Sequence, residues 1–265
     1  MTYFDSHAHY YDVRFQSEEC PGGVDALLDS LFAGDICGIV NAGTSPDTTR
    51  QAIAQARRYP SMYVAAGIHP TDGQALPDPD AALREMENML RTPQNKCVAL
   101  GEIGLDYHYP DTDRERQMYL FDAQMELAGR LGLPAVIHDR DAHGDVMDVI
   151  RRYPGTQVIL HSFSGSAEMA AELSRRGHYV SFSGTITFTN ARKVPEAARA
   201  VAPELLLIET DCPYLAPHPR RGTLNHSGNL VYTNRALAEA LRRSEEETAR
   251  LTRENACRVF GLSEI

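Results

Sequence analysis

The feature that most constrains this chain is a short apolar or β-branched run that recurs every roughly 25–35 residues, each time followed by a polar turn and an amphipathic helical pattern. Strands that alternate with helices predict a parallel sheet. Eight such units in 265 residues predict an α/β fold, a (β/α)8 TIM barrel with C-terminal helices, as a single domain over residues 1–265. An open, doubly wound sheet is the alternative. The predicted strands are residues 2–7, 36–42, 62–68, 97–103, 135–138, 157–161, 179–181 and 205–209.

Helix ends can be placed from proline and glycine. Ser45-Pro46-Asp47 is typical of a helix start, because proline fits the first helical position. Gly132 and Gly177 each follow an amphipathic stretch, as glycine does at many helix ends. The predicted helices include residues 113–131, 167–176, 229–243 and 244–260.

The charge balance disfavours a tight, non-specific DNA binder. The net charge is −10, whereas proteins that bind nucleic acid broadly carry a basic face. A nucleic-acid substrate is still allowed, since metal-binding carboxylates contribute negative charge that cations neutralise. No apolar run approaches the roughly 20 residues of a membrane span, and the N-terminus lacks the pattern of a signal peptide. We therefore expect a cytoplasmic protein without membrane contacts.

Cysteine usage argues against a disulfide framework or a zinc ribbon. The five cysteines are an odd number, and no two are at CxxC spacing. We expect them to be reduced and mostly buried. Cys212 differs in that it follows a candidate ligand, Asp211.

Histidines and carboxylates occur at the ends of predicted strands. His7 and His9 are two residues apart at the end of the first strand, so their side chains point to the same side. An HxH pair alone is weak, since neighbouring histidines are often ordinary surface residues. Four further residues of ligand type lie at other strand ends: Glu102, His138 and His161 end the fourth, fifth and sixth predicted strands, and Asp211 follows the eighth.

The position of these six residues makes them a candidate metal site. In a barrel, the C-terminal strand ends meet at one mouth, where active sites lie. Taken singly, a structural histidine or a turn-forming aspartate explains each residue. Six ionisable groups at one mouth would be costly to desolvate without a partner, and metal ions supply that partner. Four histidines and two carboxylates exceed the needs of one tetrahedral ion, so we expect two divalent ions, Zn²⁺, Mn²⁺, Fe²⁺ or Mg²⁺, with Glu102 as the bridging carboxylate.

Several motifs occur together in order and resemble the TatD branch of the amidohydrolase superfamily, from residue 5 to about residue 260. The Gly-Glu-Ile-Gly-Leu-Asp-Tyr and Glu-Thr-Asp-x-Pro stretches are specific in combination. The motifs are Asp5-Ser6-His7-Ala8-His9, Gly67-Ile68-His69-Pro70, Gly101-Glu102-Ile103-Gly104-Leu105-Asp106-Tyr107, Ile137-His138, His161-Ser162-Phe163-Ser164-Gly165 and Glu209-Thr210-Asp211-Cys212-Pro213-Tyr214-Leu215-Ala216-Pro217.

The resemblance implies a TIM barrel with a two-metal site and a metal-dependent deoxyribonuclease. The first ion would be held by His7, His9, Glu102 and Asp211, and the second by Glu102, His138 and His161. The implied activity is 3′→5′ exonuclease cleavage of DNA, linked to DNA repair. DNA ends or single-stranded DNA would be the substrate, and no obligate protein partner is implied.

Three positions depart from the family pattern. Cys212 replaces the usual Ser or Ala, and Asp139 follows His138 where a small or hydroxyl residue is common. The segment 225–229, Asn-His-Ser-Gly-Asn, replaces the usual Asn-Glu-Pro stretch. No departure removes a ligand, so they bear on substrate preference more than on metal binding.

The expected mechanism is attack on the phosphorus by a hydroxide bound between the ions, since metal binding lowers the pKa of water from about 15.7 towards 7. Asp211 would accept the proton of the water as general base. His69 would contact the scissile phosphate or protonate the leaving oxygen, although a turn histidine before Pro70 is equally consistent with the sequence. Arg140 and Arg221 are candidate phosphate contacts, because a guanidinium can bind phosphate through two nitrogens.

Two other functions fit the same residues. A metal hydrolase of ester or amide bonds, such as a lactonase, an amidase or a D-aminoacyl-tRNA deacylase, would direct the same hydroxide at a carbonyl carbon. Many barrels of this superfamily carry a carboxylated lysine on the fourth strand, where this chain has Glu102, which favours the TatD branch and leaves open which bond is cleaved. A non-catalytic metal-binding or scaffold protein would be expected to lack one or more of the six ligands.

Overall fold

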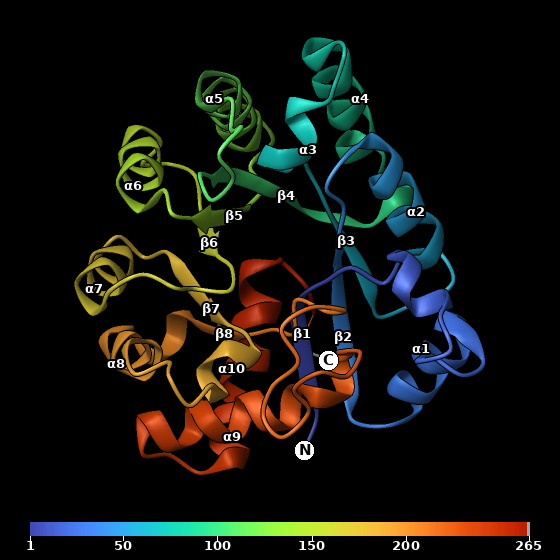
Figure 1. The fold of residues 1–265 in the computed structure, drawn as a ribbon, viewed down its shortest axis with the longest axis vertical. Helices are drawn as coiled ribbons and strands as arrows, with labels where there is room; N and C mark the ends of the chain where they lie inside the picture. Colours follow the sequence, from blue (N-terminus) through green and yellow to red (C-terminus); the bar gives the residue numbers. More distant parts are fainter. Residues whose placement is uncertain (264–265) are drawn as a thin grey trace. The chain divides into compact units, whose positions relative to one another are not determined.

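The computed structural model describes residues 1–263. Its eight strands follow one another in a single sheet in chain order (Figure 1). A parallel bridge between Ala8 and Cys212 joins the end of the first strand to the segment that follows the last one. The strands are β1 (Tyr3–Ala8), β2 (Ile36–Ala42), β3 (Met62–Ala66), β4 (Cys97–Asp106), β5 (Ala135–Arg140), β6 (Val158–Leu160), β7 (Tyr179–Phe182) and β8 (Leu206–Ile208).

Helices connect the strands, and two further helices follow β8. The C-terminal pair are α9 and α10. The helices are α1 (Gly23–Ala33), α2 (Pro46–Ala56), α3 (Pro70–Gln74), α4 (Pro79–Arg91), α5 (Arg114–Leu131), α6 (His143–Arg152), α7 (Ala167–Arg175), α8 (Lys193–Ala200), α9 (Leu230–Leu241) and α10 (Glu245–Val259). None of the helices within residues 1–263 is both long enough and apolar enough to cross a bilayer.

The chain forms two compact units. Unit 1 comprises Met1–Val40 and His161–Ile265, and unit 2 comprises Asn41–Leu160. The expectation of one domain over residues 1–265 stays a prediction, and its last two residues lie outside the described part of the chain.

In unit 2, strands β3 to β6 pair in parallel and are covered by helices. The apolar run of β5 is almost fully buried, as expected for a parallel strand covered on both faces. Helix α5 packs against β4 and carries two buried glutamines that bond to strand ends. Gln124 bonds to the backbone N–H and C=O of Ile68, and Gln117 to those of Asp106. These amides fix the chain at the C-terminal ends of β3 and β4, which are the ends that carry the candidate site.

In unit 1, α9 and α10 pack beside β1, and α10 also contacts β8 (Figure 1). Phe4 of β1 stacks on Phe260 with ring centroids 6.0 Å apart. Asn255 of α10 donates to the carbonyl of Leu206 at 2.9 Å. The C-terminal helices therefore support the two strands whose ends carry His7, His9 and Asp211.

The structure confirms the α/β fold, the (β/α)8 barrel with C-terminal helices and the eight predicted strands. The helix start at Ser45 is confirmed, because its side chain caps α2 and Pro46 is the first helical residue. Gly132 caps α5 with a φ of 66°, a conformation that glycine adopts without strain. Helix α7 ends at Arg175, two residues before Gly177.

Candidate metal centre

Unit 1 brings His7, His9 and Asp211 together at the ends of β1 and β8. The Nε2 atoms of His7 and His9 lie 3.1 Å apart. Oδ1 of Asp211 lies 3.2 Å from Nε2 of His9 and 3.8 Å from Nε2 of His7. Both histidines are buried. Three converging donor atoms of this kind, all within 4.8 Å of one another, fit the ligand preferences of Zn²⁺ and similar ions.

The backbone places Asp211 in this group. Its N–H donates to the carbonyl of His7 at 3.0 Å, and the N–H of His9 donates to the carbonyl of Cys212 at 2.8 Å. Burial raises the pKa of Asp211, but a hydrogen bond from His9 and the positive charges of neighbouring histidines outweigh burial, so the pKa is lowered overall. Asp211 is therefore ionised at neutral pH, as a metal ligand or a general base must be.

His161 belongs to the same unit and stacks on His7. The ring centroids lie 4.1 Å apart and the planes are inclined by 19°. Nδ1 of His161 lies 3.2 Å from Oε1 of Glu209, a fully buried carboxylate that also accepts from the N–H of Ser162 at 2.7 Å. A carboxylate partner fixes the orientation of an imidazole and leaves its other nitrogen for a ligand.

A buried carboxyl group, Asp5, ties these segments together. It accepts hydrogen bonds from the N–H of Thr210 at 2.9 Å, the Thr210 hydroxyl at 2.6 Å and the Ser227 hydroxyl at 2.7 Å. Burial raises the pKa of Asp5 to about 7, against the lowering effect of these hydrogen bonds. Asp5 holds Thr210, the neighbour of Asp211, beside the strand that carries His7.

Unit 2 forms a second group from His69, Glu102 and His138. Oε1 of Glu102 lies 2.8 Å from Nδ1 of His138 and 3.4 Å from Nε2 of His69. Each residue contributes one donor atom, and these atoms lie within 4.8 Å of one another. His69, which the sequence suggested as a substrate contact, thus lies beside Glu102 and offers a donor atom to the same group.

Second partners orient both histidines of this group. Nδ1 of His69 lies 2.8 Å from the hydroxyl of Thr71. Nε2 of His138 lies 3.3 Å from Oδ2 of Asp106, a buried carboxylate whose backbone N–H is bonded to Gln117. Burial raises the pKa of Asp106, but hydrogen bonds from His138 and His108 lower it overall.

Sequence reasoning missed the roles of three carboxylates that support the histidines or Asp211. Asp5, Asp106 and Glu209 each lie inside a quoted motif, close in sequence to a predicted ligand. A signal was present: an acidic residue inside a buried strand end needs a partner. The sequence did not indicate which partner each one has.

The two candidate arginines lie on the surface and stack on aromatic rings. The guanidinium of Arg140 lies 5.6 Å from the ring centroid of Tyr109, and that of Arg221 lies 4.1 Å from that of Phe188. Arg221 also donates to the carbonyl of Ala216 at 3.3 Å. Their roles as phosphate contacts stay predictions.

The departures at positions 212 and 139 leave the candidate ligands in place. Cys212 is buried, and burial raises the pKa of its thiol far above the ordinary value, so the thiol is unreactive at neutral pH. Asp139 accepts from Nδ1 of His143 at 2.7 Å. All five cysteines of the chain are free thiols, and Cys20, Cys212 and Cys257 are buried.

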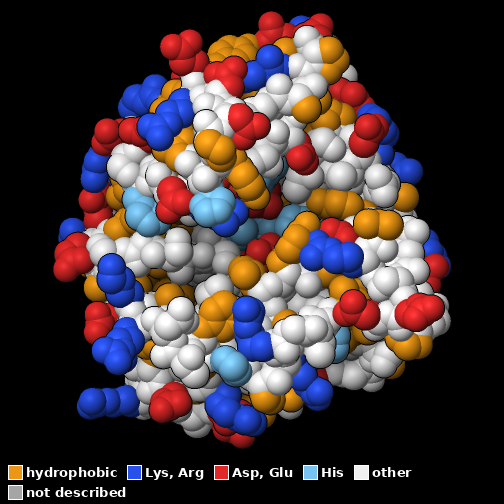
Figure 2. All heavy atoms as spheres, viewed as in Figure 1, with side chains coloured by type: hydrophobic (Ala, Val, Ile, Leu, Met, Phe, Trp, Pro, Cys, Tyr) orange, Lys and Arg blue, Asp and Glu red, His pale blue; other side chains and the backbone are white. Residues whose placement is uncertain are grey.

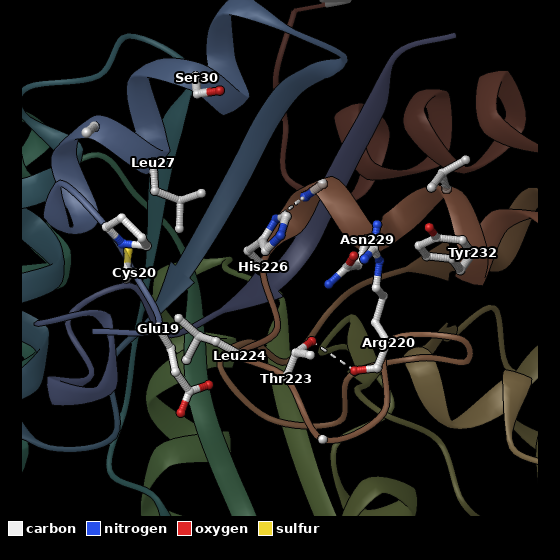
Figure 3. A pocket seen from close by; sticks show the side chains of 15 residues that line it. Glu19, Cys20, Leu27, Ser30, Arg220, Thr223, Leu224, His226, Asn229 and Tyr232 are labelled. Carbon is white, nitrogen blue, oxygen red and sulfur yellow. Dashed lines mark hydrogen bonds between the residues drawn. The ribbon is translucent and has the colours of Figure 1, made fainter. Parts of the chain in front are cut away.

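Residues 225–229 have both a structural and a surface role. The side-chain amide of Asn225 donates to the carbonyls of Thr210 at 2.9 Å and Tyr214 at 2.6 Å. His226 and Asn229 line a pocket of about 900 Å³ between α1 and the segment before α9 (Figure 3). None of the six predicted ligands lines it. The segment therefore supports the loop after β8 and also forms part of a separate surface cavity.

A (β/α)8 barrel whose strand ends hold groups of histidines and carboxylates has the architecture of a metal-dependent hydrolase. The family model described as TatD related DNase matches residues 4–261. The chain therefore belongs to the TatD family, and it is a metal-dependent hydrolase.

Relatives along the whole chain support this assignment. The metal-dependent hydrolase YabD of Bacillus subtilis is 35% identical over 98% of this chain and 99% of its own length. The metal-dependent hydrolase TatD of Mycobacterium tuberculosis is 39% identical over 90% of this chain and 91% of its own length. The crystal structure of YjjV, a TatD homologue from Escherichia coli, is 28% identical, covers 98% of both chains and superposes with a TM-score of 0.87.

Proposed function

We propose that this protein is a metal-dependent deoxyribonuclease that hydrolyses phosphodiester bonds at the 3′ ends of single-stranded DNA. The observation that carries the proposal is the pair of donor groups, His7–His9–Asp211 and His69–Glu102–His138. The match to a family of TatD related DNases supports DNA as the substrate class.

The donor atoms fit divalent metal ions. Each group combines imidazole nitrogens with carboxylate oxygen, which suits Zn²⁺ or Mn²⁺ better than Mg²⁺. His9 and His138 each have a partner on the other ring nitrogen, Tyr11 at 3.0 Å and Asp106 at 3.3 Å, as ligating histidines do. A second ion, a ligand role for His161 and a bridging role for Glu102 remain part of the proposal.

The side chains have distinct roles in the proposed reaction. Bound divalent ions would supply acidity to water and neutralise charge on the phosphate. Asp211, ionised at neutral pH, accepts the proton of the attacking water. His69, oriented by Thr71, binds the phosphate or protonates the leaving oxygen.

Contacts to DNA are expected to be few and local. The net charge is −10, and on the face in Figure 2 basic and acidic side chains are interspersed. A broad electrostatic interface would need a continuous basic surface. Arg140 and Arg221 are the proposed phosphate contacts, and an enzyme acting on strand ends needs no more than such local contacts.

The test is reconstitution of metal-stripped protein with one divalent ion at a time. Each form is assayed on single-stranded DNA labelled at the 3′ or the 5′ end and on D-aminoacyl-tRNA. We expect metal-dependent release of the 3′-terminal nucleotide first. Release from the 5′ end would reverse the proposed polarity. Hydrolysis of the aminoacyl ester, with DNA left intact under every ion, would replace the nuclease with a deacylase.

Replacement of Glu102 tests the centre itself. Glu102→Ala removes the carboxylate shared by His69 and His138, so metal-dependent hydrolysis should fall at least about 100-fold while the far-ultraviolet circular dichroism is kept. Glu87→Ala, which removes surface ion pairs to Arg91 of α4 and Arg130 of α5, is the control. Full activity of Glu102→Ala would exclude Glu102 from the centre. In parallel, His69→Ala should lower turnover more than metal content, and loss of metal from that variant would make His69 a ligand.

A further inference from the structure

An exposed aromatic side chain lies beside His9 in unit 1. Tyr214 follows β8, and 46% of its surface is exposed. Its ring centroid lies 6.2 Å from that of His9, with the rings inclined by 80°. Single exposed aromatic side chains are common on protein surfaces, so what distinguishes Tyr214 from the equally exposed Tyr119 is its place beside a candidate metal ligand.

Tyr214 is held in a fixed orientation by charged neighbours. The guanidinium carbon of Arg14 lies 3.8 Å from the centroid of the Tyr214 ring. Asp12 binds this guanidinium through both carboxylate oxygens, at 3.0 and 2.8 Å. The Tyr214 hydroxyl donates to the same carboxylate at 3.2 Å. Because the ring is fixed before any ligand arrives, binding to it costs little conformational entropy.

Neighbouring residues extend the surface and keep it neutral. Val13, between Asp12 and Arg14, is 72% exposed and adds apolar area. Since Asp12 neutralises Arg14, this surface offers an aromatic ring and a guanidinium plane more than a net positive charge.

We propose that Tyr214 and Arg14 form a nucleobase-binding subsite, on which the base next to the cleaved phosphodiester stacks. This inference rests on the proposed nuclease function and adds to it a contact to the base. Bases stack on aromatic rings and on guanidinium planes, and such stacking tolerates any base sequence. A subsite of this kind gives a protein with net charge −10 a means of holding single-stranded DNA that does not depend on a basic surface.

The experiment measures binding of a fluorescent, phosphorothioate-linked single-stranded oligonucleotide to the manganese-loaded protein by anisotropy. Tyr214→Ala should weaken binding about tenfold, and Tyr214→Phe should bind within about twofold of wild type. Tyr214→Leu keeps apolar bulk without an aromatic face and should resemble Tyr214→Ala. The matched control is Tyr119→Ala on α5, because Tyr119 is 48% exposed and its hydroxyl also bonds to a carboxylate, that of Asp80.

A base-deletion series assigns the effect to stacking. Each oligonucleotide of the series carries one abasic tetrahydrofuran unit, placed at a different position. At one position the missing base should weaken binding to wild type about tenfold and leave binding to Tyr214→Ala unchanged. Additive losses at every position would overturn the subsite, as would unchanged binding by Tyr214→Ala. Circular dichroism and metal content establish that each variant is folded and loaded.

The outcomes separate the subsite from the function on which it rests. If wild-type protein cleaves DNA and Tyr214→Ala cleaves and binds it equally well, the subsite is wrong and the nuclease stands. If wild-type protein neither binds nor cleaves DNA with any divalent ion, the nuclease is wrong and the subsite falls with it. If Tyr214→Leu binds as wild type does, apolar contact rather than stacking is responsible, and the proposal fails.

Discussion

Replacing Asp106 by asparagine is the sharpest probe of how the group in unit 2 is oriented. Oδ1 of Asp106 accepts from the N–H of His108 at 3.0 Å, and Oδ2 lies 3.3 Å from Nε2 of His138. Asparagine has the same shape but only one oxygen. If that oxygen stays with His108, the amide N–H₂ faces His138. Nε2 of His138 must then be the acceptor, so Nδ1 carries the proton.

This change of tautomer takes the lone pair from Nδ1 of His138, the nitrogen that faces the centre. Nδ1 of His138 lies 2.8 Å from Glu102, and a protonated Nδ1 has no lone pair for a metal ion. If the amide turns over instead, its N–H₂ faces the backbone N–H of His108, and two donors then stand opposite each other. Removing such a supporting carboxylate typically costs about 10- to 100-fold in metal affinity, which corresponds to about 1.4–2.7 kcal/mol.

The assay is competition for Mn²⁺ between the protein and a chelating dye, followed by turnover of single-stranded DNA at saturating metal. The control is Asp141→Asn, which disrupts a similar contact between Oδ2 of Asp141 and Nδ1 of His108 at 3.1 Å. Both partners there are exposed, so the change should be small. Metal affinity of Asp106→Asn within about twofold of wild type would refute the proposed orientation of His138.

Two further predictions concern stability. Burial lowers the pKa of His178 to about 4, so the folded state favours the neutral ring, and the stability this gives is complete above about pH 6.5 and is lost as the pH falls towards 4. Between pH 6.5 and 5 the free energy of unfolding, measured in urea, should fall by about 2 kcal/mol more for wild type than for His178→Leu. Equal losses would rule out this role of His178. Ser227→Ala removes a donor to buried Asp5 and the side-chain partner of the Tyr10 hydroxyl, which keeps the bond from the Ser227 N–H, and should lower the free energy of unfolding by about 1–3 kcal/mol. Exposed Ser30→Ala should change it little, and an equal loss in both variants would contradict the role of Ser227.

The strands and the positions of the ligand-type residues were predictable because both follow from local patterns. The apolar run 135–137 predicts a buried strand with His138 at its end; in the structure β5 continues two residues beyond His138, to Arg140. Some observed strand boundaries differ from the predicted ones. β4, predicted to end at residue 103, continues to Asp106, because Gly104, Leu105 and Asp106 pair with β5.

The supporting carboxylates were not predictable, because their partners are distant along the chain. Asp106 reaches His138 over 32 residues, Glu209 reaches His161 over 48, and Asp5 reaches Thr210 over 205. No periodicity within one segment encodes such pairs. The grouping of His69 with Glu102 and His138 likewise depends on how three separate strands align their ends.

The link between Asp5 and Thr210 has a consequence for how the protein is made. Since 205 residues separate the two, the N-terminal histidines leave the ribosome long before Asp211 is translated. The His7–His9–Asp211 group is therefore assembled only after the segment that follows β8 has been translated. A nascent chain stalled before β8 would carry His7 and His9 without Asp211, so the candidate centre in unit 1 cannot form until the chain has been translated past Asp211.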